Sequence, residues 1–154
     1  MSKLHNLGLF ARFGGPFDRV FFILSITGDS LIPDDISSLI GLNPTKSYKK
    51  GDQTISGAQY RKTGAWILDS GEIKLKEDEF ESAYFLKWIR SLPESSNVWK
   101  KLNSNYEIVV RLVGYTNQMN ADFEITPEIM GELTARNLNL AVEPYLSLDE
   151  GDDE

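Results

Sequence analysis

The side chains best suited to binding chemistry are concentrated between residues 46 and 62. This segment has five cations and two tyrosines but only one carboxylate, Asp52, so its net charge is +4. Cations pair with phosphates or carboxylates, and they also lie over aromatic rings. An ordinary charged loop is the simpler interpretation, because surface charge clusters contribute little on their own. The candidate binding residues are Lys46, Tyr48, Lys49, Lys50, Tyr60, Arg61 and Lys62.

The residues used in nucleophilic catalysis are scarce. The chain has no cysteine and one histidine, His5, which precedes a stretch rich in glycine and phenylalanine. Ser-His and Cys-His pairs therefore lack a credible base. We assign no catalytic residue and expect a protein that is not an enzyme. Paired carboxylates stay open as an alternative, because their partners are set in three dimensions.

Metal and cofactor motifs are not recognisable in the sequence. Asp34 and Asp35 stand at an expected helix start, where the helix dipole alone explains carboxylates. The acidic run 149–154 lacks the alternating ligands and turn glycine of an EF-hand loop. Gly57 and Gly64 are too sparse for a phosphate-binding loop. We therefore expect neither a metal nor a cofactor.

The composition is that of one globular domain. The chain has 154 residues, of which 41% are hydrophobic and 25% charged. We divide it into an aromatic N-terminal arm (1–17), an α+β domain (18–148) and an acidic tail (149–154). The tail carries five of the charges that make up the net −7, so the rest is only mildly acidic. Duplex nucleic acid is therefore not an expected partner.

The cellular location is expected to be the cytoplasm. The absence of cysteine fits a reducing compartment. The N-terminal residues do not form a convincing export signal, because Arg12, Gly14 and Gly15 interrupt the apolar stretch. The apolar run 20–24 is far shorter than the roughly 20 residues that cross a bilayer, so no membrane association is expected.

The hydrophobic pattern predicts an α+β fold. Apolar residues are nearly continuous over 19–27, as is typical of a strand covered on both faces. Residues 43–61 have no apolar period and are expected to form a long loop. Three or four helices should pack on a mixed or antiparallel sheet of about five strands. We expect strands over 19–27, 62–70, 107–115, 121–125 and 138–146, and helices over 33–40, from 77–79 to 92, over 97–102 and from 126 onward.

Three strings give the chain a family resemblance. They are ITGDSLIPDDI (26–36), LNPTKSYKKG (42–51) and RKTGAW (61–66). With these strings, residues 18–146 resemble domain-of-unknown-function family 4279, a mostly bacterial family. The resemblance implies no established activity, cofactor or catalytic residue. By association it suggests a small accessory protein of bacterial conflict or regulation, including immunity proteins.

Three functions follow as hypotheses. The first is a non-enzymatic module that binds another protein, and more narrowly an immunity protein that neutralises a toxin. The second is a sensor or enzyme that holds a phosphorylated small ligand in the basic segment 46–62. The third is a structural or self-associating domain, in which the aromatic residues 8–17 exchange between copies. The oligomeric state and the identity of the partner stay open.

Overall fold

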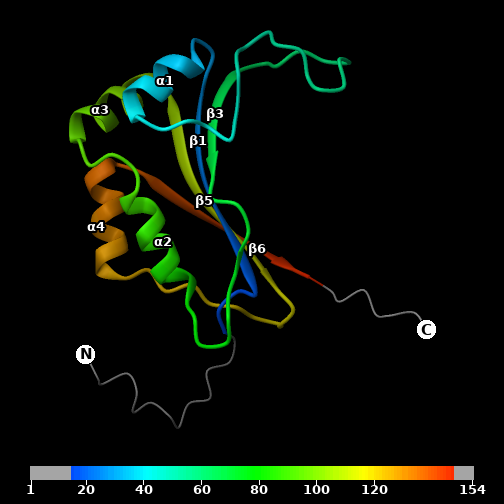
Figure 1. Ribbon diagram of the computed structural model, residues 1–154, viewed down its shortest axis with the longest axis vertical. Coiled ribbons are helices and arrows are strands. Elements are labelled where there is room, and N and C mark those ends of the chain that lie inside the picture. Colours follow the sequence, from blue (N-terminus) through cyan, green and yellow to red (C-terminus); the bar gives the residue numbers. More distant parts are fainter. Residues whose placement is uncertain (1–14, 148–154) are drawn as a thin grey trace.

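A twisted sheet carries all the helices on one of its faces (Figure 1). The computed structural model describes residues 15–147. In chain order the elements are β1 (Arg19–Gly28), α1 (Pro33–Ile40), β2 (Lys46–Tyr48), β3 (Gly64–Asp69), β4 (Ile73–Lys74), α2 (Glu81–Arg90), α3 (Ser96–Asn105), β5 (Glu107–Thr116), α4 (Pro127–Arg136) and β6 (Asn139–Leu146).

The sheet has the strand order β2-β3-β1-β5-β6, and the short β4 also pairs with β1. β1 is antiparallel to both β3 and β5, with Ser25 paired to Ile67 on one side and to Val109 on the other. β6 returns after α4 and pairs with β5 in parallel, Leu112 opposite Val142. The expected single-domain α+β fold with a mixed sheet is thus confirmed.

The hydrophobic core lies between the sheet and the helices. Alternate residues of β1, from Val20 to Ile26, are fully buried, because successive side chains of a strand point to opposite faces. Val110 and Leu112 continue this layer in β5. The helices cover it with Phe85, Ile89, Trp99, Leu102 and Ile129, all buried.

The helix ends follow the signals expected from the sequence. Pro33 is at the start of α1, and Gly41 ends that helix with a positive φ of 77°. At α4, the Thr126 hydroxyl accepts a hydrogen bond from the backbone N–H of Ile129, as an N-cap residue does.

Residues 121–125 do not form the strand that their sequence predicts. Only Ala121 pairs, in a single bridge with Gly15, and the following residues are irregular. Both sides of β5 are already occupied by β1 and β6, so no place in the sheet remains next to it. The apolar Phe123 instead packs its ring against the ring of Phe85 in α2, with 5.9 Å between the ring centroids.

Two glycines allow a matched test of the packing. A Cβ atom on Gly114 would lie 2.5 Å from the ring of the buried Phe17, so Gly114→Ala should lower the free energy of unfolding by about 1–3 kcal/mol. Gly131 in α4 has open space around its Cα, and Gly131→Ala should raise this free energy by about 0.5–1 kcal/mol. Urea denaturation measures the free energy of unfolding of both variants, and an equal change in the two would contradict this packing.

Candidate functional site

The basic segment is an ordered two-stranded ribbon that extends the β2–β3 pair. Three backbone hydrogen bonds join its two sides, including Arg61 N–H to Asp52 O at 2.7 Å and Thr54 N–H to Gln59 O at 2.8 Å. Gly57, with a φ of 69°, closes the turn at the tip. We call residues 49–63 the basic hairpin. The expected irregular loop over 43–61 is therefore wrong in part, because the segment contains β2 and this ladder.

Contacts at its base fix the hairpin to the domain. Just before β2, the strand that leads into the hairpin, the Thr45 hydroxyl donates to Ile67 O at 3.0 Å and accepts from Asp69 N–H at 3.1 Å. At the base itself, Lys50 pairs with Asp29 in the turn after β1. Hydrogen bonds from Lys50 and then Thr63 hold the pKa of the Asp29 carboxyl below its usual value. The hairpin is thus positioned by both the sheet and this turn.

The structure divides the seven candidate residues into small groups. Arg61 lies over the ring of Tyr48, with 4.1 Å from its guanidinium carbon to the ring centroid. Register places Tyr48 and Lys46 on the sheet face opposite the helices. Lys50 is engaged by Asp29.

Three of the candidate lysines are available to a partner. Among residues 15–147, Lys46, Lys49 and Lys62 form no ion pair. The structure thus engages Arg61 and Lys50 within the chain and leaves these three lysines without an ion pair among the described residues.

The most exposed apolar side chains of the hairpin lie at and near its tip. Ile55 is 95% exposed, and Tyr60, on the returning side, is 66% exposed. Figure 1 shows this excursion reaching beyond the start of β3, at the end of the sheet where β1 ends. The sequence does not single out Ile55 as a candidate. Its only signal is that it is one isoleucine in a polar segment without an apolar period.

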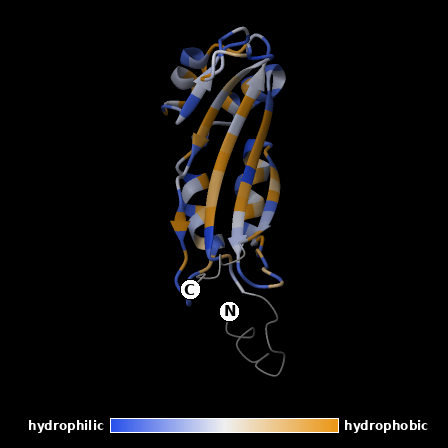
Figure 2. Cartoon of the chain, turned by 90° about the vertical axis from the view of Figure 1, so that its right-hand side faces the viewer, coloured by the Kyte–Doolittle hydropathy of each residue, from blue (hydrophilic) through white to orange (hydrophobic). Residues whose placement is uncertain are grey.

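A second surface is the sheet face that carries no helix, shown toward the viewer in Figure 2. Phe21, Ile23, Ile67, Val109 and Val113 lie on it, as their register with one another requires. All five are half-buried, and none belongs to the core cluster. The sequence suggested that β1 is covered on both faces. Within the described residues, that expectation is wrong. We call this surface the open face.

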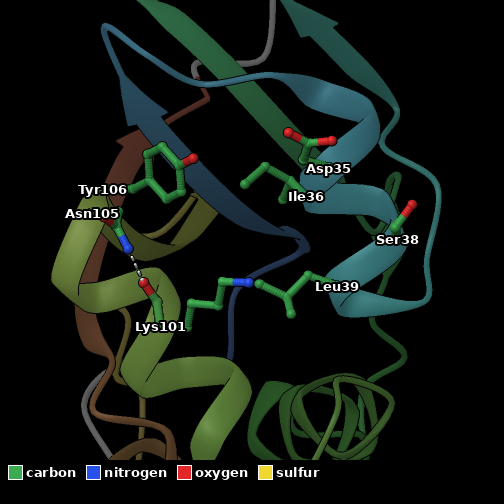
Figure 3. A pocket seen from close by; sticks show the side chains of 7 residues that line it. All are labelled: Asp35, Ile36, Ser38, Leu39, Lys101, Asn105 and Tyr106. Atoms are coloured by element: carbon green, nitrogen blue, oxygen red, sulfur yellow. Dashed lines mark hydrogen bonds between the residues drawn. The ribbon is translucent and has the colours of Figure 1, made fainter.

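A hollow of about 400 Å³ between α1 and α3 is the third feature (Figure 3). Lys101 extends across it from α3 toward Leu39 of α1. Its volume is that of a small-ligand site, but such sites place polar groups in a buried, convergent setting. Here the charged side chains of Asp35 and Lys101 are exposed. The other lining residues are Ile36, Ser38, Asn105 and Tyr106, and none of the seven candidate residues is among them.

Residues 15–147 offer neither a metal-binding group of side chains nor a helix that could cross a membrane. No three histidine, cysteine or acidic residues come together there in a group that could hold a metal ion. None of the helices in this part of the chain has the length and apolar character needed to cross a bilayer. His5 and the tail 149–154 lie outside the described residues.

Comparison with known proteins gives a family and nothing more specific. Residues 18–147 match the family described as Domain of unknown function (DUF4279), which confirms the resemblance read from the three sequence strings. Neither a curated protein nor a solved structure matches the chain.

Proposed function

The chain belongs to the DUF4279 family, and we propose that it is a non-enzymatic module that binds another protein through the basic hairpin. One observation carries the proposal: a hydrogen-bonded ribbon projects from the domain and presents exposed Ile55 and Tyr60, while Lys49 and Lys62 at its base form no ion pair within residues 15–147. Tyrosine and large apolar side chains surrounded by charged residues are typical of the energetically dominant parts of protein interfaces.

The rigid frame of the hairpin favours this role. A binding loop that is disordered in the free protein loses conformational entropy when it is ordered by a partner. The ladder between Asp52 and Arg61 and the pair between Lys50 and Asp29 already hold the hairpin in one shape. Most of the contact energy is then available for affinity.

The chemistry of the hairpin indicates its partner. Lys49 and Lys62 favour a protein surface rich in carboxylates, because opposite charges raise the rate of association. Ile55 requires an apolar pocket in that surface. The narrower form of the proposal is that the partner is a toxin and that this chain is an immunity protein. It extends the suggestion, made from the family resemblance alone, of an accessory protein in bacterial conflict.

The test uses the protein encoded by the neighbouring gene, with isothermal titration calorimetry as the measurement. Ile55→Ala and Tyr60→Ala should each weaken binding about tenfold or more, as truncated interface anchors do. Lys49→Glu with Lys62→Glu should mainly lower the association rate and its dependence on salt. The control is Met119→Ala, a fully exposed side chain at the opposite end of the sheet. Full affinity in all the hairpin variants would contradict the proposal.

A phosphorylated ligand in the same segment is the competing hypothesis, and one measurement separates the two. A ligand at 100 times its dissociation constant stabilises the folded protein by about 2.7 kcal/mol. We expect nucleotides to leave the melting temperature unchanged. A rise in melting temperature that Lys50→Ala abolishes would instead favour the ligand.

A further inference from the structure

We infer that the open face is the interface of a homodimer, in which two sheets pack face to face with their strands antiparallel. This goes beyond the proposed function, which concerns the hairpin. The starting observation is the disagreement between sequence and structure at β1. Its residues are apolar on both faces, yet among residues 15–147 only the face with Val20 and Phe22 is covered by helices.

The open face has the composition of an interface. Apolar and charged side chains alternate on it: Ile23, half-way along the central strand of the sheet, lies opposite Asp69 on one side and Arg111 on the other. Two ion pairs involve this face, Arg111 with Glu143 at 3.1 Å and Arg19 with Glu72 at 3.1 Å. Such pairs can be covered without leaving an isolated charge, which would oppose association.

Aromatic side chains extend this apolar surface toward the end where β1 begins. The rings of Tyr115 and Tyr145 are stacked with 5.4 Å between their centroids, and Phe21 meets Tyr115 edge to face. Arg19 lies over the Tyr115 ring at 4.1 Å. Tyrosine and arginine are enriched in protein interfaces relative to other surface.

The area is sufficient for a stable contact. Strands of ten residues are about 33 Å long, and five strands spaced about 4.8 Å apart are about 24 Å wide. Because β2 and β3 are short, the face covers on the order of 600 Å², close to the roughly 800 Å² that each partner contributes to a standard interface. Packed sheets that stay about 10 Å apart would interdigitate these side chains.

The distribution of charge selects a second copy in the antiparallel orientation. One end of the sheet carries the basic hairpin. The opposite end, where β1 begins and β5 ends, is acidic. An antiparallel twofold arrangement places each basic end against an acidic end, whereas a parallel one opposes like charges. Arg19, Lys74 and Lys76 offset three of the six described carboxylates of this end, which leaves −3; these carboxylates are Asp18, Glu72, Glu77, Asp78, Glu79 and Asp122.

Sedimentation equilibrium of the full chain tests the inference. We expect the wild type to be a dimer at micromolar concentration and Ile23→Glu to raise the dimer dissociation constant by more than about 100-fold, since each dimer would bury two further carboxylates beside Asp69, and the neighbouring Arg111 is already paired with Glu143. The matched control is Met130→Glu, an exposed position of α4 on the helix side, which should remain dimeric. A monomeric wild type, or a dimeric and folded Ile23→Glu, would overturn the inference.

A milder substitution covers the case in which Ile23→Glu does not fold. The chain has no cysteine, so Ile23→Cys places a single thiol at the centre of the open face. A short bismaleimide should link two such chains, whereas Ser38→Cys on the exposed side of α1 should stay unlinked. Linking of Ser38→Cys but not of Ile23→Cys would overturn the proposed interface. Salt tests the orientation: dimer affinity should fall as ionic strength rises, and an affinity independent of salt would refute the antiparallel arrangement.

Discussion

Replacement of Trp66 by alanine is expected to lower the free energy of unfolding by about 3–5 kcal/mol, the cost of deleting a large aromatic side chain from a core. Trp66 is fully buried in β3, next to the base of the basic hairpin. Its indole N–H donates to the Ser37 hydroxyl of α1 at 3.0 Å. The substitution therefore removes core packing and the hydrogen bond between β3 and α1 together.

The same variant should loosen the hairpin without changing its sequence. Hydrogen exchange at the amides of Thr54 and Arg61, which close the ladder, is expected to quicken more than exchange in β5. Trp66→Phe, which retains most of the packing, is the control and should be destabilised less. If Trp66→Ala lowered the free energy of unfolding by less than about 1 kcal/mol, Trp66 would not be holding this end of the domain together.

Replacement of Arg136 by methionine is expected to lower the free energy of unfolding by about 3 kcal/mol. This is the lower end of the range for removing one member of a buried ion pair. Arg136 is 1% exposed at the end of α4. Its guanidinium donates to Glu132 at 2.6 Å and to the backbone carbonyls of Leu92 and Pro93 after α2. Methionine fills much of the volume but leaves both carbonyls without this donor. Chemical denaturation measures the free energy of unfolding, and an unchanged value would contradict this role of Arg136.

The pH dependence of stability tests the Arg136 site independently. Hydrogen bonds from Arg90 and then Arg136 hold the pKa of the Glu132 carboxyl below its usual value of 4.5. A lowered pKa contributes stability that is present above about pH 4.5 and is lost as the pH falls through the folded value. Wild type should therefore lose more stability than Glu132→Gln below pH 4.5. Equal losses would show that the carboxylate is not stabilised by its arginines.

Local signals in the sequence predicted most of the fold. Strand β5 alternates, and its buried Val110 and Leu112 face the helices as expected. Pro33 and Gly41 gave the bounds of α1, because proline suits a first helical position and glycine adopts the left-handed conformation that ends a helix. These features depend on the chain within a few residues of themselves.

The features that the sequence does not predict depend on contacts between residues far apart in the chain. Whether Phe123 enters a strand is decided by β6, which takes the place beside β5. The ladder of the basic hairpin is made of backbone hydrogen bonds, which leave no hydrophobic period in the sequence. The charges between Lys46 and Lys62 did identify the segment, but only the structure shows how Arg61 and Tyr48 pair within it.

The position of β1 in the middle of the sheet has a consequence for synthesis on the ribosome. β1 can pair with β3 early, but its other edge waits for β5, whose Val109 is 84 residues beyond its partner Ser25. At about 5–20 residues per second, that edge stays unpaired for several seconds after β3 has emerged. An unpaired apolar strand edge is a template for aggregation, so the nascent chain is an expected client of chaperones that shield such segments.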